Sequence, residues 1–136
     1  MKKDSQQPNI VIYTTEDGQA KLQVKIEDET VWLTQKQMSE LFQKDVRTIN
    51  EHIQNIFGEG ELDPDSVIRN YRITAADGKT YDTQHCNLEV VISVGYRVKS
   101  MRGTQFRIWA TQRLREYIIK GFVLDDERLK QQAAAG

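Results

Sequence analysis

His85 and Cys86 are the residue types that form a thiol nucleophile in enzymes, and they are neighbours in this chain. Such a couple needs its imidazole within hydrogen-bonding distance of the sulfur. The segment over residues 80–86 has the character of a strand, and adjacent strand residues point to opposite faces, so these two side chains would not meet. We therefore expect Cys86, the one cysteine of the chain, to be a small buried apolar side chain.

Metal and phosphate chemistry is not indicated either. The two histidines do not lie at ligand spacing from carboxylates, and a single cysteine builds neither a thiolate zinc site nor an internal disulfide. The segment Gly58-Glu59-Gly60 lacks the basic helix of a phosphate loop, and its glutamate would repel phosphate. We expect no enzymatic activity and no cofactor, with a nuclease or a nucleotidyl-modifying enzyme as the remaining alternative in this class.

The polar residues between positions 46 and 57 are suited to reading DNA bases. Apolar residues in this segment recur at helical spacing and leave a polar face opposite to them. On that face Arg47 suits guanine, and Gln54 or Asn55 suits adenine. Thr48 suits a phosphate or a thymine methyl group, whereas Glu51 fits a DNA surface less well. The sequence predicts four base-reading residues: Arg47, Thr48, Gln54 and Asn55.

A second helix is predicted directly before this segment. Thr34 and Gln37 have the spacing of a capping box, which predicts a helix from residue 35 to about residue 43. The pair Lys44-Asp45 then interrupts it, and Asp45 can cap the following helix. Two short helices joined by a tight turn over residues 34–57 form a helix-turn-helix, in which the first helix braces the second in the major groove. The alternative is an ordinary pair of helices with a solvated outer face.

Cations that could hold DNA phosphates lie mostly outside this unit. The net charge is −1, but residues 1–66 carry 7 Lys/Arg and 13 Asp/Glu, whereas residues 97–120 carry 7 and 1. Local potential, not net charge, steers association with a polyanion. The predicted phosphate-binding residues are Arg97, Lys99, Arg102 and Arg107 in the basic segment, and Arg69 and Arg72 before it. Alternatively, the basic segment pairs with the acidic half, within one chain or across a dimer.

Several runs of β-forming residues predict a small antiparallel sheet. The runs over residues 9–13 and 22–26 flank Asp17-Gly18, which suits a hairpin turn, and residues 30–33 add a third strand. The runs over residues 67–73 and 80–86 flank Asp77-Gly78 and predict a second hairpin. This hairpin is either a wing that lies along a phosphate strand or an ordinary sheet edge.

Two more helices complete the predicted fold. Asn87 can cap a helix that runs to about Val98; its β-branched residues would also suit a strand, but the spacing of the apolar residues favours a helix. A long helix is predicted from about Thr104 to Lys120, followed by Gly121. The fold class is therefore α+β, with a small antiparallel sheet of hairpins, a helix-turn-helix and a long C-terminal helix.

The length of 136 residues predicts one domain. We expect a flexible N-terminus over residues 1–9, the α+β domain over residues 10–124 and a polar tail over residues 125–136. No apolar run approaches the ~20 residues of a membrane span, and no apolar segment of a secretory signal follows the basic start. The cytoplasm is the expected location.

Two stretches of the sequence resemble the bacterial virulence-protein RhuM family. The first is Val31-Trp32-Leu33-Thr34-Gln35-Lys36-Gln37-Met38-Ser39-Glu40-Leu41-Phe42 with the following residues 47–53, and the second is Ile92-Ser93-Val94-Gly95-Tyr96-Arg97-Val98 with residues 102–111. The resemblance covers roughly residues 10–130. It implies DNA binding or gene regulation, because the family is similar to phage antirepressor-type modules. Family members are usually longer, which implies a C-terminal partner domain, and the Fic signature of some relatives is absent here.

We therefore expect a module that binds double-stranded DNA as a homodimer, in transcriptional, mobile-element or defence regulation. The alternative is a protein-interaction module of a defence, toxin or virulence-associated system, whose basic segment docks on an acidic protein partner.

Overall fold

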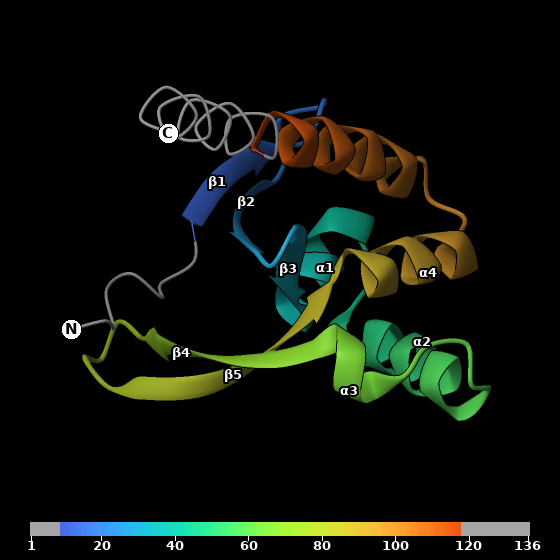
Figure 1. The fold of residues 1–136 in the computed structure, drawn as a ribbon, viewed down its shortest axis with the longest axis horizontal. Helices are drawn as coiled ribbons and strands as arrows, with labels where there is room; N and C mark the ends of the chain where they lie inside the picture. Colours follow the sequence, from blue (N-terminus) through green and yellow to red (C-terminus); the bar gives the residue numbers. More distant parts are fainter. Residues whose placement is uncertain (1–8, 118–136) are drawn as a thin grey trace, which may run out of the picture.

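One antiparallel sheet and two groups of helices make up the fold in the computed structural model, which describes residues 9–117 (Figure 1). The strands are β1 (Asn9–Thr14), β2 (Lys21–Glu27), β3 (Thr30–Thr34), β4 (Ile68–Thr74) and β5 (Thr80–Asn87), in the order β1-β2-β3-β5-β4. The helices are α1 (Gln35–Phe42), α2 (Val46–Gly58), α3 (Pro64–Val67), α4 (Leu88–Val98) and a further helix over residues 101–117. The predicted α+β class is confirmed.

The hydrophobic core lies between one face of the sheet and the helices. Alternation along β2 places Leu22, Val24 and Ile26 on this face, where they are buried. Their neighbours in the core come from α1, α2, α4 and the last helix, and include Met38, Leu41, Ile49, Ile53, Val90, Val94 and Phe106. The opposite face of the sheet carries mainly polar and aromatic side chains, together with the exposed Ile10 and Ile12 of β1.

Side-chain caps begin the helices α1 and α2 at the residues that the sequence predicted. Thr34 Oγ1 accepts a hydrogen bond from the Gln37 amide at 3.0 Å, and Gln37 Oε1 accepts one from the Thr34 amide at 2.9 Å. The left-handed Gln43 ends α1, and the Asp45 carboxylate accepts from the Thr48 amide at 2.8 Å to begin α2. Asn87 caps α4 in the same way, which confirms a helix over the alternative strand.

Two features differ from the prediction. The short helix α3 begins at Pro64 behind an Asp63 cap, in a segment for which no helix was predicted. The last helix begins at residue 101 and not at Thr104, because the Ser100 hydroxyl accepts from the Arg102 amide at 3.1 Å and caps it. The predicted end of this helix and the predicted polar tail lie outside the described residues.

None of the helices over residues 9–117 has the length and apolar character that a bilayer crossing requires.

Candidate nucleic-acid interface

The helix pair of α1 and α2 lies between two strands of the sheet and is followed by a β-hairpin. β3 leads into α1 and α2, β4 and β5 follow as a hairpin, and β3 pairs with β5, so the order of these three strands is β3-β5-β4. We call residues 68–87 the wing hairpin. In Figure 1, α2 and the wing hairpin form the lower edge of the molecule. One elongated ligand could therefore contact both.

One face of α2 is buried and the other is open. Ile49, Ile53 and Ile56 are buried in the core. The open face carries the predicted base-reading residues Arg47, Gln54 and Asn55, which are all exposed. Of the predicted residues only Thr48 is half-buried, and it lies at the edge of this face beside the Asp45 cap.

Asn50 is a residue of this face that the sequence analysis missed. Its side chain is exposed, and its Oδ1 accepts a hydrogen bond from Gln35 Nε2 of α1 at 3.2 Å. Its position, three residues after Arg47 and four before Gln54, places it on the same line along the helix. This spacing was the signal that could have found it. Its amide is of the type that pairs with adenine.

The charged residues of α2 form a weak pair. Arg47 Nε lies 3.7 Å from Glu51 Oε2, and the two side chains are 88% and 64% exposed. An exposed pair of this spacing contributes about 0.2–0.5 kcal/mol. Arg47 can therefore leave Glu51 for an acceptor on a base at little cost.

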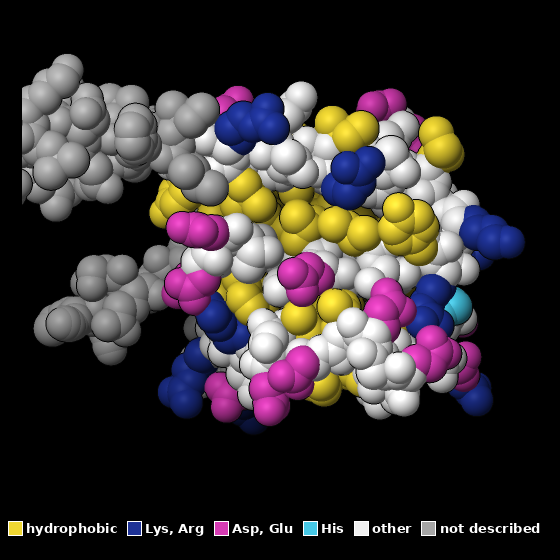
Figure 2. All heavy atoms as spheres, turned by 45° about the vertical axis from the view of Figure 1, so that its right-hand side comes forward, with side chains coloured by type: hydrophobic (Ala, Val, Ile, Leu, Met, Phe, Trp, Pro, Cys, Tyr) yellow, Lys and Arg dark blue, Asp and Glu magenta, His cyan; other side chains and the backbone are white. Residues whose placement is uncertain are grey.

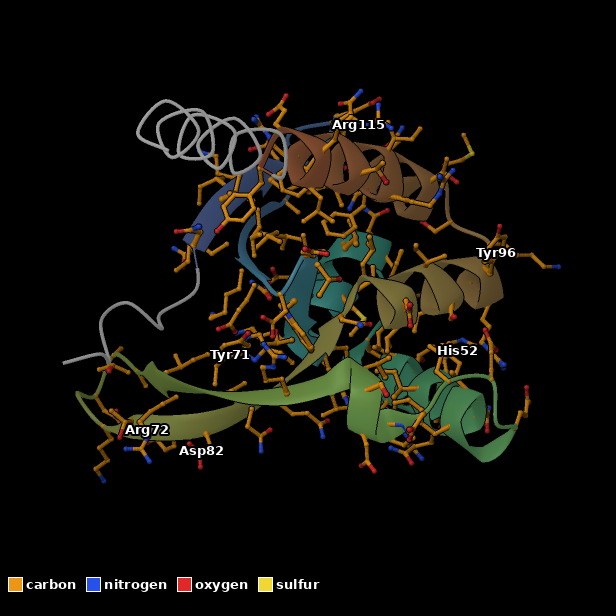
Figure 3. All side chains as sticks on the ribbon, in the orientation of Figure 1. His52, Tyr71, Arg72, Asp82, Tyr96 and Arg115 are labelled. Carbon is orange, nitrogen blue, oxygen red and sulfur yellow. The ribbon has the colours of Figure 1, made fainter. Side chains whose placement is uncertain are left out.

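The wing hairpin has cations on its outer side. Arg72 Nε lies 3.6 Å from Asp82 Oδ1, and both side chains are more than two-thirds exposed. Figure 3 shows both residues on the side of the hairpin opposite to Tyr71. Lys79 is exposed in the turn between the strands. Arg72 and Lys79 are thus accessible to a phosphate.

Arg69, in contrast, is engaged on the inner side of the hairpin. Its guanidinium donates to Glu27 at 2.9 Å and to Asp28 at 2.7 Å, and its Cζ lies 4.4 Å from the centroid of the Trp32 ring. Tyr71 also donates a hydrogen bond to Glu27, and burial together with this bond raises the pKa of Tyr71 to about 12. A phosphate contact by Arg69 would break this network.

Two arginines of the basic segment are likewise engaged within the chain. Arg97 donates to Glu59 at 2.8 Å and to Glu61 at 2.9 Å. Arg102 donates to an Asp17 carboxylate, and its side chain is only 11% exposed. Both arginines therefore pair with carboxylates of residues 1–66, which is the alternative that the sequence analysis gave for the basic segment. Phosphate binding by Arg69, Arg97 and Arg102 stays a prediction that their contacts disfavour.

Lys99 and Arg107 lie elsewhere. Both are exposed and line a groove of about 290 Å³ between α4 and the helix over residues 101–117, together with the exposed apolar residues Tyr96 and Met101. Figure 1 shows α4 between α2 and this last helix. In the upper half of the face in Figure 2, hydrophobic side chains gather in a band. These two predicted phosphate-binding residues are therefore not continuous with the open face of α2.

The α2 and wing region is not strongly basic. Residues 44–84 contain five Lys/Arg and eight Asp/Glu. Figure 2 shows acidic and basic side chains mixed over the lower part of the molecule. Binding of DNA here would depend on a few directed contacts more than on a general attraction to phosphate.

The residues weighed for nucleophilic and metal chemistry do not form such a site. Cys86 is fully buried, and burial raises the pKa of its thiol to about 12, so it holds its proton at neutral pH. Within residues 9–117, no group of three or more His, Cys, Asp or Glu residues is placed to hold a metal ion. The prediction that Cys86 is a buried apolar side chain is confirmed.

Comparison with known proteins identifies a family for the C-terminal half of the chain. The profile described as "Virulence protein RhuM family" matches residues 66–136. The match includes the second of the two resembling stretches and leaves out the first, at residues 31–53. No curated protein and no solved structure matches. The matched residues amount to just over half of the sequence, and the chain belongs to the virulence protein RhuM family.

Proposed function

We propose that this protein binds double-stranded DNA by placing α2 in the major groove. The observation that carries the proposal is the open polar face of α2 in a helix pair that is followed by a wing. An α-helix with its side chains is about 10–12 Å across, and the major groove is about 12 Å wide, so one helix fits into the groove. Arg47, Gln54 and Asn55 read bases, and Asn50 joins them.

The wing hairpin supplies the second contact. Arg72 and Lys79 reach the phosphates that flank the groove, because they lie on exposed parts of the hairpin beside the helix pair. Contacts of this kind fix the register of a protein on the duplex but carry no sequence information. Base reading therefore belongs to α2, and positioning belongs to the wing.

The biological role that we propose is regulation of transcription, of a mobile element or of a defence system. Such a regulator binds as a homodimer to an inverted repeat, whose half-sites lie about 10 base pairs apart or at a multiple of this distance. The sequences selected from a random library would show this symmetry directly.

The test of the proposal is selection of bound duplexes from a random library at about 50 mM salt, where electrostatic binding is strong. We expect a recurring sequence. Arg47→Ala should weaken binding to the selected duplex by about 1–3 kcal/mol and leave non-specific binding almost unchanged. Arg115→Ala is the matched control, because Arg115 is exposed on the last helix, away from α2 (Figure 3). Absence of any duplex binding would refute the proposal.

The groove between α4 and the last helix favours a second function, the docking of a protein. Tyr96 and Met101 are 79% and 73% exposed, more than the other large apolar side chains in the described part of the chain, and exposed apolar side chains that share a groove are typical of a protein-binding surface. Lys99 and Arg107 border the same groove, so an acidic segment with an apolar anchor would fit.

The test of this second function is a pull-down with charge-reversed variants. Lys99→Glu and Arg107→Glu should release a stoichiometric partner, and Lys36→Glu on α1 should retain it. Arg102 is unsuitable for this test because its side chain stabilises the fold. Retention of the partner by all three variants would contradict docking in this groove.

A further inference from the structure

The second face of the sheet, opposite to the hydrophobic core, contains a polar pocket. Strand pairing brings Thr34 opposite His85 and Tyr71 opposite Thr83, so the side chains of these residues share a face. A pocket of about 490 Å³ opens on this face, between the wing hairpin, β2 and the start of α1. It borders the open face of α2, because its lining residue Gln35 donates a hydrogen bond to Asn50 of that face.

The lining of this pocket is positively charged. Among its ten residues are Lys25 and Lys36 and no Asp or Glu, although the chain has more acidic than basic residues. Within the described part of the chain, neither lysine forms an ion pair. α1 also begins at the wall of the pocket, but the Thr34 hydroxyl already accepts from the Gln37 amide of its first turn, so the positive charge comes from the two lysines. The pocket therefore favours an anion.

His85 adds a hydrogen-bond acceptor to the pocket. The residue is 1% exposed, and its Nδ1 lies 2.9 Å from the carbonyl oxygen of Thr83. A carbonyl only accepts, so Nδ1 carries the proton and Nε2 presents a lone pair. Burial lowers the pKa of His85 and outweighs the hydrogen bond to Thr83, which raises it, and the charge of Lys25 lowers the pKa further, so the neutral ring is favoured.

Nε2 of His85 has no hydrogen-bonding partner among residues 9–117. Among residues 9–117, the hydroxyl of Tyr13 is the polar side-chain atom that is both inaccessible and without a hydrogen-bonding partner. Nε2 of His85 is not such an atom, so it remains accessible from the pocket. The pocket thus combines a nearly buried hydrogen-bond acceptor that lacks a donor with the positive charge of two lysines. A ligand that satisfies it must combine negative charge with an O–H or N–H group.

We propose that this pocket binds a small oxyanion that carries its own O–H group, with hydrogen phosphate as its simplest form. Lys25 and Lys36 attract the negative oxygens, and the O–H donates to Nε2 of His85. The phosphodiester of a DNA backbone has no such O–H group, so the ligand is a free small molecule and not the nucleic acid that α2 is proposed to bind.

The test compares phosphate with sulfate, two tetrahedral anions of similar size. In mildly alkaline buffer both are dianions, but only hydrogen phosphate has a proton to donate. Titrations followed by amide NMR shifts should show saturable binding of phosphate at residues 83–85 and 34–37. Sulfate should bind about tenfold or more weakly, because it leaves Nε2 without a donor.

Two variants separate the roles of charge and acceptor. Lys36→Met should weaken phosphate binding severalfold, and because Lys36 is exposed the fold should survive. Lys44→Met is the matched control, since Lys44 lies outside the pocket in the turn between α1 and α2, and it should bind as the unmodified chain does. His85→Phe should remove the preference for phosphate over sulfate.

Three outcomes would overturn the proposal. The first is equal affinity for phosphate and sulfate, and the second is unchanged phosphate binding in Lys36→Met. The third is the absence of saturation up to about 10 mM phosphate, which would mean a dissociation constant too high for a specific site. The titrations contain no DNA. Their failure would therefore leave the proposed DNA-binding function standing, and loss of DNA binding would leave this pocket unaffected.

Discussion

Arginine side chains in this protein divide into those that support the fold and those that remain accessible. Arg102 belongs to the first kind: its guanidinium donates to the carbonyl oxygens of Glu40 and Leu41, each at 3.2 Å, and to the carboxylate of Asp17. A cation at this place satisfies carbonyls at the end of α1 and joins the β1–β2 loop to the last helix. Arg47 belongs to the second kind, with a side chain that is 88% exposed.

Removal of the Arg102 charge should therefore destabilise the protein. We expect Arg102→Met to lower the free energy of unfolding in urea by about 1.5–3 kcal/mol, the range for hydrogen bonds to charged groups. Arg107→Met is the control: Arg107 is exposed, so its substitution should change the stability by less than about 0.5 kcal/mol. Equal stability of the two variants would contradict the role assigned to Arg102.

The acid sensitivity of the fold should depend on Asp17. Hydrogen bonds from the Gln19 amide, the Thr15 hydroxyl and Arg102 lower the pKa of Asp17 from 3.8 to about 2. The pKa of Asp17 is lower in the folded state than in the unfolded state, so the ionised carboxylate stabilises the fold. This stabilisation is complete at pH values above 3.8, the pKa of the unfolded state, and is lost as the pH falls towards about 2. The unfolding free energy of Asp17→Asn should therefore depend less on pH in this window. Parallel profiles for both proteins would show that Asp17 contributes nothing.

Glycine determines how closely α4 and the last helix approach. A Cβ on Gly103 would lie 3.2 Å from the Cα of Gly95 and 3.2 Å from Cε1 of Phe42. Both neighbours are buried, and one of the contacts is with backbone. A methyl group at residue 103 would therefore push the two helices apart.

Alanine should have opposite effects at two helical glycines. Gly103→Ala gains up to about 1 kcal/mol of helix propensity but overpacks the helix contact by about 1–3 kcal/mol, so we expect a net loss of stability. A Cβ on Gly58 would meet nothing within 4 Å, and Gly58→Ala should stabilise the protein by about 0.5–1 kcal/mol. Thermal unfolding of both variants checks this; stabilisation by Gly103→Ala would refute the close contact.

The wing hairpin should contribute affinity without sequence preference. We expect Arg72→Ala and Lys79→Ala each to weaken binding of selected and random duplexes alike. Each should also reduce the slope of log affinity against log salt by about 1. Lys21→Ala, at the start of β2, is the control and should leave the slope unchanged. A loss confined to the selected duplex would place these residues in base reading.

Local signals predicted most of the elements. The capping box of Thr34, the Asp45 cap and the Asn87 cap lie within three residues of the amides that they bind, so sequence spacing alone reveals them. The start of the last helix was missed because Gly103 resembles a helix breaker. The Ser100 cap is a local signal for this start, whereas the close approach of Gly103 to Gly95 exists only in the folded chain.

The same distinction applies to the candidate interface. The open face of α2 follows from helical spacing, and the sequence predicted Arg47, Gln54 and Asn55 on it. The engagement of Arg97 with Glu59 and Glu61 joins residues 38 and 36 positions apart. No spacing rule links residues at such separations, so the sequence could only leave the pairing of the basic segment as an alternative.

Across the whole molecule, distinct surfaces are available for distinct ligands. The lower edge in Figure 1 presents α2 and the wing hairpin, and the groove that contains Tyr96 and Met101 lies on the other side of α4. DNA and a protein partner would therefore not compete for the same residues. With a net charge of −1 and a mixed α2 surface, binding should depend on sequence more than on non-specific attraction.

The central claim is that α2 contacts DNA, and backbone hydrogen exchange with and without a selected duplex tests it most directly. The account predicts that DNA slows exchange in residues 46–58 and in the turn over residues 75–79, while the groove between α4 and the last helix is unchanged. Slower exchange confined to that groove, with α2 unaffected by the duplex, would contradict it.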